Sequence, residues 1–155
     1  MKTTRHHIRE KTLQVLYAYQ LSGDPIEKVK NDLLTDVKDE EHLSFAHELI
    51  SYVIENEKRF DELARSAIDN WDMDRIALID LIIIKICLAE LFYFEDIPPK
   101  VSINEAIELA KAFSTRNSSK FVNGVLDALH IRLTKSGDIK KTGKGLITTS
   151  EKTAG

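Results

Sequence analysis

The sequence is poor in cysteine, proline and glycine. Its one cysteine, Cys87, cannot form an internal disulfide and lies in an apolar run, which predicts a buried thiol in a reducing compartment. With only three prolines and six glycines, a chain that is 43% hydrophobic and 30% charged has enough apolar surface to offset the entropy of its ordering. A length of 155 residues favours one compact unit over two independent domains.

The chain also lacks segments that would direct it to a membrane. Residues 1–10 are polar and charged, without the apolar core of a secretory signal. The most apolar stretch, residues 76–94, is long enough to span a bilayer, but it contains Asp80, Lys85 and Glu90. Each of these charges would cost about 2.5–3.5 kcal/mol near the bilayer centre. We therefore expect a cytoplasmic protein in which this stretch is a central core helix.

Motifs for catalysis, cofactors and metals are missing as well. Gly137 and Gly143 are separated by five residues rather than the four of a phosphate loop, and Gly145 stands where that loop requires Ser or Thr. The five histidines match neither a HExxH motif nor a Cys/His zinc spacing. We predict no catalytic residues, no metal ligands and no cofactor.

Helical periodicity fills most of the chain. Apolar residues recur at spacings of three and four, and no strand-like alternation is present, so we predict an all-α fold with about seven helices. The expected helices cover about residues 4–21, 26–35, 41–58, 60–70, 76–94 and 102–113, and a last one follows a polar loop at 114–119. Ser22-Gly23-Asp24-Pro25 ends the first of them.

Local signals predict where segments begin and end. The Ser-x-x-Glu spacing of Ser102 and Glu105 predicts a capping box, and Gly124 inside the last helix suggests close helix packing. The charged stretch Trp71–Arg75 separates two subdomains, residues 1–72 and 73–135. Residues 136–155 lack periodicity and are expected to form a disordered tail.

The net charge is only −3, so the distribution of charge is more informative than its sum. The first eleven residues contain six basic or imidazole side chains and one acidic residue, Glu10. Arg5 and Arg9 are four residues apart and share a helix face with His6 alongside, which suits contact with RNA phosphates. A solubilising, frayed terminus is the alternative, and the cluster alone leaves both open.

A second candidate surface combines cations with aromatic rings. Phe113 precedes the polar loop, and Lys120-Phe121 follows it. Single-stranded RNA is held by rings that stack on bases and by cations that contact phosphates. Helical geometry places Phe121 at the edge of an apolar stripe, which predicts a half-exposed ring; burial of both phenylalanines in the core is the alternative.

Residues 100–114, KVSINEAIELAKAFS, and residues 119–127, SKFVNGVLD, closely resemble the C-terminal signature of the NusB transcription antitermination family. Arg9-Glu10-Lys11 leading into LQVLY at 13–17, and KICLAEL at 85–91, resemble the family in the same order. The resemblance spans about residues 5–133.

This resemblance implies a fold of two small helical bundles packed together and a non-enzymatic role. Members of the family bind single-stranded boxA RNA in ribosomal RNA transcripts, together with the ribosomal protein NusE and the transcription elongation complex. Transferred by position, the RNA-binding residues would be Arg5, His6, His7, Arg9, Phe113, Lys120 and Phe121, and the partner-binding residues would be Tyr17, Asp74 and Asp80.

Two departures from the family pattern concern RNA affinity. His6 and His7 stand where consecutive arginines are common, and histidines with a pKa of about 6.5 are mostly neutral at pH 7. Asn117 occupies a loop position that is often acidic, and Arg116 precedes it. Two alternative functions stay open: a protein-only helical scaffold, and the NusB-like accessory domain of some ribosomal RNA methyltransferases, for which this chain lacks room and a Gly-rich cofactor motif.

Overall fold

The computed structural model describes residues 4–68 and 76–147, and in these ranges the chain is helical with no strand. The prediction of an all-α fold with about seven helices is confirmed. The elements are α1 (Arg5–Ser22), α2 (Ile26–Leu33), α3 (Glu40–Glu55), α4 (Glu57–Ser66), α5 (Leu78–Tyr93), α6 (Pro99–Phe113), α7 (Arg116–Ser136) and the short 3-10 helix η2 (Gly143–Leu146).

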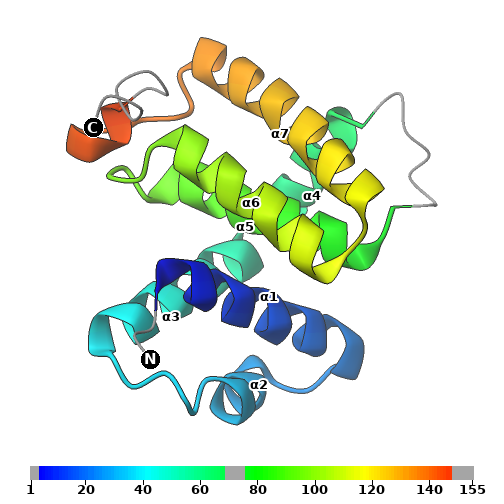
Figure 1. Cartoon of the computed structure of the whole chain (residues 1–155), viewed down its shortest axis with the longest axis vertical. Helices are drawn as coiled ribbons and strands as arrows, with labels where there is room; N and C mark the ends of the chain where they lie inside the picture. Colours follow the sequence, from blue (N-terminus) through cyan, green and yellow to red (C-terminus); the bar gives the residue numbers. More distant parts are fainter. Residues whose placement is uncertain (1–3, 69–75, 148–155) are drawn as a thin grey trace.

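Helix α5 lies at the centre of the molecule. It packs against α1 and α3 on one side and against α4, α6 and α7 on the other, as Figure 1 shows. Its residues Ile83, Ile84 and Leu88 are fully buried, so the prediction of a central core helix is confirmed. Cys87 is also buried there, and this burial raises the pKa of its thiol well above the ordinary value.

The helices form two packed groups, α1–α3 and α4–α7 (Figure 1). Helix α4 packs on α5 and α7 and so joins the second group, while the predicted division at residues 72–73 stays a prediction. The predicted seam at Trp71–Arg75 lies outside the described residues. Lys85, buried in α5, contacts Glu57 at 3.9 Å and Asp61 at 3.6 Å, which ties α4 to the central helix.

Three local predictions can be compared with the structure. Gly23 ends α1 in the left-handed conformation, with φ of 72°, as its position after the apolar stripe predicted. The capping box is wrong, because α6 begins at Pro99 and the buried Ser102 hydroxyl donates to Oε1 of Glu90 at 2.8 Å. The polar loop is shorter than predicted, since Thr115 caps α7 by accepting a hydrogen bond from the Ser118 amide.

Residues 137–147 do not form the disordered tail that the composition suggested. The Lys141 ammonium donates to the main-chain carbonyls of Glu90 at 3.1 Å and Phe94 at 2.8 Å, at the C-terminal end of α5. The Thr142 amide donates to the carbonyl of Glu95 at 3.0 Å. These bonds hold the segment and η2 beside the loop between α5 and α6 (Figure 1). Residues 148–155 lie outside the described residues.

Gly124 in α7 and Gly145 in η2 have opposite surroundings. A Cβ atom added to Gly124 would meet nothing within 4 Å, so the predicted close helix packing at this residue is wrong. A Cβ atom on Gly145 would lie 1.9 Å from the carbonyl oxygen of Glu95, which only a glycine avoids. This close approach of Gly145 to Glu95 occurs in the segment that the sequence predicted to be disordered.

Candidate nucleic-acid interface

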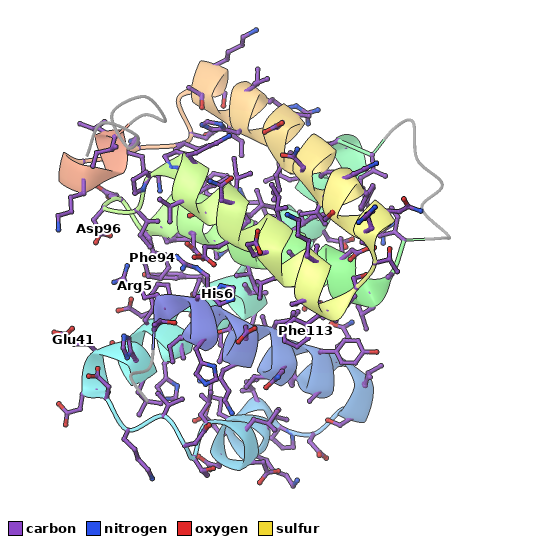
Figure 2. The ribbon with its side chains drawn as sticks, viewed as in Figure 1. Arg5, His6, Glu41, Phe94, Asp96 and Phe113 are labelled. Atoms are coloured by element: carbon purple, nitrogen blue, oxygen red, sulfur yellow. The ribbon has the colours of Figure 1, made fainter. Side chains whose placement is uncertain are left out.

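The first turn of α1 presents Arg5 to solvent. Thr4 caps this turn by accepting a hydrogen bond from the His7 amide at 3.2 Å, which fixes the direction of the helix start. The Arg5 guanidinium lies 4.5 Å from the ring centroid of Phe45, and Phe45 packs edge-on against Phe94 at 5.2 Å. Because the ring supports one face of the guanidinium, Arg5 is held in place while its charge stays available to a ligand (Figure 2).

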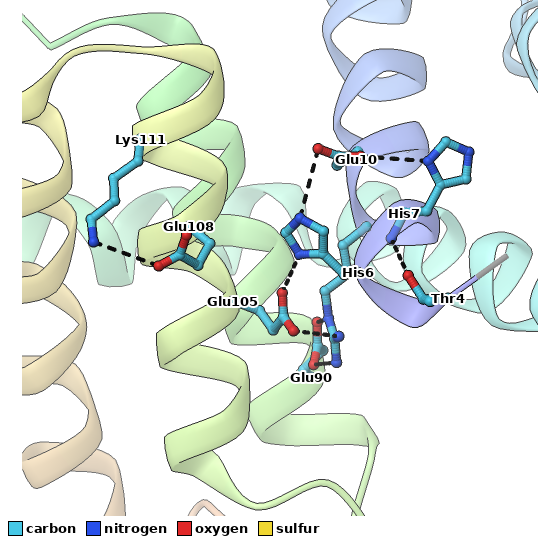
Figure 3. Close-up of polar contacts among 9 residues, drawn as sticks. Thr4, His6, His7, Glu10, Glu90, Glu105, Glu108 and Lys111 are labelled. Atoms are coloured by element: carbon cyan, nitrogen blue, oxygen red, sulfur yellow. Dashed lines mark hydrogen bonds and ion pairs between the residues drawn. The ribbon is translucent and has the colours of Figure 1, made fainter. Parts of the chain in front are cut away.

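His6 is held by a carboxylate from the other helical group. Its Nδ1 lies 2.6 Å from Oε2 of Glu105 in α6, and its Nε2 lies 3.7 Å from Oε2 of Glu10 (Figure 3). The hydrogen bond to Glu105 raises the pKa of His6 above its ordinary value, and burial opposes this effect. His6 therefore carries more positive charge near neutral pH than an unperturbed histidine. His7 is exposed, with its Nδ1 3.5 Å from Oε1 of Glu10.

Arg9 faces the interior and not the surface that the sequence predicted for it. Only 3% of the residue is exposed, and its Nε and Nη2 donate to the two carboxylate oxygens of Glu90 at 2.7 and 2.8 Å. Its Nη1 lies 3.7 Å from Oε1 of Glu105. The expected row of Arg5 and Arg9 on one exposed face is therefore wrong, since the central helix takes up the second guanidinium.

The second candidate surface lies at the junction of α6 and α7. Lys120 is exposed and Phe113 is half-buried, whereas Phe121 is only 7% exposed and belongs to the core. The predicted half-exposed ring of Phe121 is therefore wrong. Arg116 and Lys120 are both exposed and four residues apart on α7, so their cations share one face.

The two groups of predicted RNA-binding residues stand apart along α6. His6 contacts α6 at Glu105, and Phe113 lies eight residues further, about 12 Å along the helix axis. Figure 2 shows Arg5 and His6 at the start of α1 and Phe113 at the far end of α6. Between the two groups α6 exposes Glu108 and Lys111, which pair at 3.5 Å (Figure 3). The structure thus contains two cationic clusters, and the Glu108–Lys111 ion pair lies between them.

The predicted partner-binding residues differ in their exposure to solvent. Tyr17 is 37% exposed on α1. Asp80 is 4% exposed in the first turn of α5, and within the described part of the chain its Oδ1 has no hydrogen-bond partner. A carboxylate in that turn is favoured by the helix dipole, which gives Asp80 a structural role. Asp74 lies outside the described residues.

Three residues of the candidate interface were not predicted from the sequence. Phe45 supports Arg5 from about forty positions away, and Glu105 pairs with His6 across ninety-nine positions. No local pattern signals either contact. The sequence drew attention to Arg116 only as the neighbour of Asn117. That it shares a helix face with Lys120 follows once α7 is known to begin at residue 116.

Over residues 4–68 and 76–147, no group of three or more His, Cys, Asp or Glu side chains is arranged to hold a metal ion. None of the helices in these ranges combines the length and the apolar character needed to cross a membrane. The candidate site consists of cations, a supporting ring and histidines, groups that can hold an anion by charge and hydrogen bonding.

The fold and the site define a class: an all-helical protein of two packed bundles, with exposed cations at the starts of α1 and α7. The chain belongs to the NusB family, whose model matches residues 6–130. It is 42% identical over 149 residues to the transcription antitermination protein NusB of Chloroherpeton thalassium, which covers 95% of this chain and 71% of that protein.

Solved structures agree with this assignment. A structure of T. maritima NusB superposes with a TM-score of 0.76 at 32% identity, covering 83% of this chain and 92% of that one. A structure of the antitermination factors NusB and NusE in complex with dsRNA superposes with a TM-score of 0.75 at 21% identity, covering 83% and 96%. The predicted two-bundle fold of the family is confirmed by these superpositions.

Proposed function

We propose that this protein is a transcription antitermination factor that binds boxA-type single-stranded RNA in ribosomal RNA transcripts together with the ribosomal protein NusE. The observation that carries the proposal is the exposed, ring-supported Arg5 beside a His6 of raised pKa, at the basic start of α1 in a NusB-family chain. The solved complex of the antitermination factors NusB and NusE with dsRNA supports contact with NusE and with RNA. In this role the protein binds and assembles, performs no catalysis and acts in the cytoplasm.

RNA contact is assigned first to Arg5, His6 and His7, and then to Phe113, Arg116 and Lys120 at the second cluster. Each cluster offers cations for phosphates, and the half-buried Phe113 ring offers an edge or face to an unstacked base. Arg9 and Phe121 act indirectly, because Arg9 fixes α1 on α5 and Phe121 anchors the first turns of α7 in the core.

The test is a titration of labelled single-stranded RNA containing a boxA-like element, with and without NusE, at several salt concentrations. We expect binding that weakens as salt rises, because phosphate contacts release counterions, and that tightens when NusE is present. A matched RNA of scrambled sequence is the control. No binding to the boxA-like RNA in either condition would contradict the proposal and favour the protein-only scaffold.

The surface for NusE is proposed to include Tyr17, with Asp80 supporting the start of α5 from inside. Tyr17→Ala should weaken NusE binding while leaving the free energy of unfolding nearly unchanged, because the ring is 37% exposed. Asp80→Lys would place a cation in a buried first turn and should cost at least about 2 kcal/mol of stability. Loss of NusE binding by Asp80→Lys in a fully stable protein would instead show direct contact.

A further inference from the structure

A cavity of about 380 Å³ lies between α7, the start of α6 and the segment of residues 139–147. None of the residues assigned above to RNA or NusE contact lines it. Its volume falls in the range of small-molecule sites, about 300–1,000 Å³.

The charged side chains that line this cavity are all basic. Lys100 comes from α6, His130 from α7 and Lys141 from the segment that follows α7, and no acidic residue lines the cavity. Burial lowers the pKa of His130, and the charges of Lys100 and Lys141 lower it further, against the opposite effect of Asp127. Lys100 and Lys141 are therefore close enough for their charges to act on His130.

Lys141 has no carboxylate partner to neutralise it. Two of its ammonium protons are donated to the carbonyls of Glu90 and Phe94, and no carboxylate of the described residues lies within 4 Å of its Nζ. Burial lowers the pKa of Lys141, and the charges of Glu90, Asp96 and Glu95 oppose this effect. An anion in the cavity would bring a negative charge beside this buried ammonium and so favour its charged form.

The rest of the wall is apolar. Ile139, Leu146 and Ile147 line it. No aromatic ring lines the cavity, so it offers no stacking platform for an RNA base. Its chemistry suits an apolar chain that ends in one negative charge.

We infer that this cavity binds a small organic anion with an apolar body, such as a medium-chain carboxylate, with the carboxylate toward Lys100, His130 and Lys141 and the chain against Ile139, Leu146 and Ile147. Gly145 makes the cavity possible, because its lack of a Cβ lets η2 lie against the Glu95 carbonyl and close one side. The ligand binds separately from RNA, so failure of this site would leave the antitermination proposal intact.

The test uses octanoate as the probe and two-dimensional amide NMR spectra of the full chain as the readout. We expect dose-dependent shifts of the Ile139, Gly145 and Leu146 amides and of the His130 ring. Octanol is the uncharged control and octylamine the cationic one, and both should bind at least about tenfold more weakly, since about 1.4 kcal/mol of charge-assisted bonding is a factor of ten.

Variants separate the charge from the apolar wall. Lys100→Gln should weaken octanoate binding about three- to tenfold, and Lys111→Gln, an exposed lysine on the same helix, should leave it unchanged. Leu146→Asp should abolish binding while the amide spectrum of the helices stays folded. The absence of shifts at millimolar octanoate, or equal shifts with octanol and octanoate, would overturn the inference.

Discussion

Arg9 and Glu90 are joined by two parallel hydrogen bonds of 2.7 and 2.8 Å, with the arginine 3% exposed and the glutamate 1% exposed. This pair fastens α1 to the central helix α5. Ser102 donates to the same carboxylate from α6, so three helices meet at one buried charge.

Arg9→Ala should therefore act on stability and not on RNA contact. Removing the guanidinium leaves Glu90 buried without its cation, and loss of one partner of such a pair costs about 3–5 kcal/mol. Urea unfolding monitored by circular dichroism measures the change. A variant that unfolds at the wild-type urea concentration but binds RNA more weakly would show that Arg9 contacts phosphate directly.

Arg5→Ala should weaken RNA binding and leave the stability of the protein almost unchanged. The exposed cation–ring contact with Phe45 contributes only about 0.5–1 kcal/mol, whereas the lost phosphate contact should reduce the salt slope of RNA binding by about one. RNA titrations at four salt concentrations measure the slope. Arg5→Lys is the matched control, because it retains the charge; a wild-type slope for Arg5→Ala would remove this residue from the interface.

His6 should titrate above its ordinary value of 6.5 in the folded protein, because the hydrogen bond to Glu105 favours the charged imidazole. The stabilising contact is then complete below pH 6.5 and is lost as the pH rises through the raised pKa. RNA affinity should fall over the same rise. NMR titration of the His6 ring gives the midpoint directly.

Glu105→Gln should lower that midpoint, and His6→Gln should remove the corresponding part of the pH dependence of RNA binding. Glu108→Gln is the matched control, since Glu108 lies one turn along α6 and pairs with Lys111. A His6 midpoint at or below 6.5 in the unmodified protein would refute the proposed role of Glu105.

Gly124→Ala and Gly145→Ala form a pair with opposite expected effects. At exposed Gly124, inside α7, alanine has open space and should stabilise the protein by about 0.5–1 kcal/mol. At Gly145 the new Cβ would meet the Glu95 carbonyl at 1.9 Å, so the segment around η2 should detach from the α5–α6 loop. Thermal unfolding checks the first effect, and amide hydrogen exchange at Thr142 checks the second; equal protection of Thr142 in both variants would contradict the packing at Gly145.

Local patterns were sufficient for most of the helices. Gly23 and Pro25 predicted the end of α1, because only a few residue types suit a helix terminus. The long apolar stretch of α5 predicted a central helix for a different reason, because so many apolar side chains with few charges among them must be buried. Ser102 misled the local reading, because its hydroxyl had two uses, as a helix cap or as a donor to a buried carboxylate, and only Glu90 decides between them.

The sequence by itself determined the helical class, the central position of residues 76–94 and the resemblance to the NusB family, because periodicity, composition and motif order are properties of the chain. Only the tertiary structure decided which cations are available. Arg5 and Arg9 are chemically alike and lie four residues apart on α1, and both guanidiniums lie near the Phe45 ring, yet Arg5 is exposed and Arg9 is paired with Glu90 in the interior. The reason is physical: the exposure of a charge depends on which distant side chain packs against it, and helical periodicity does not encode that contact.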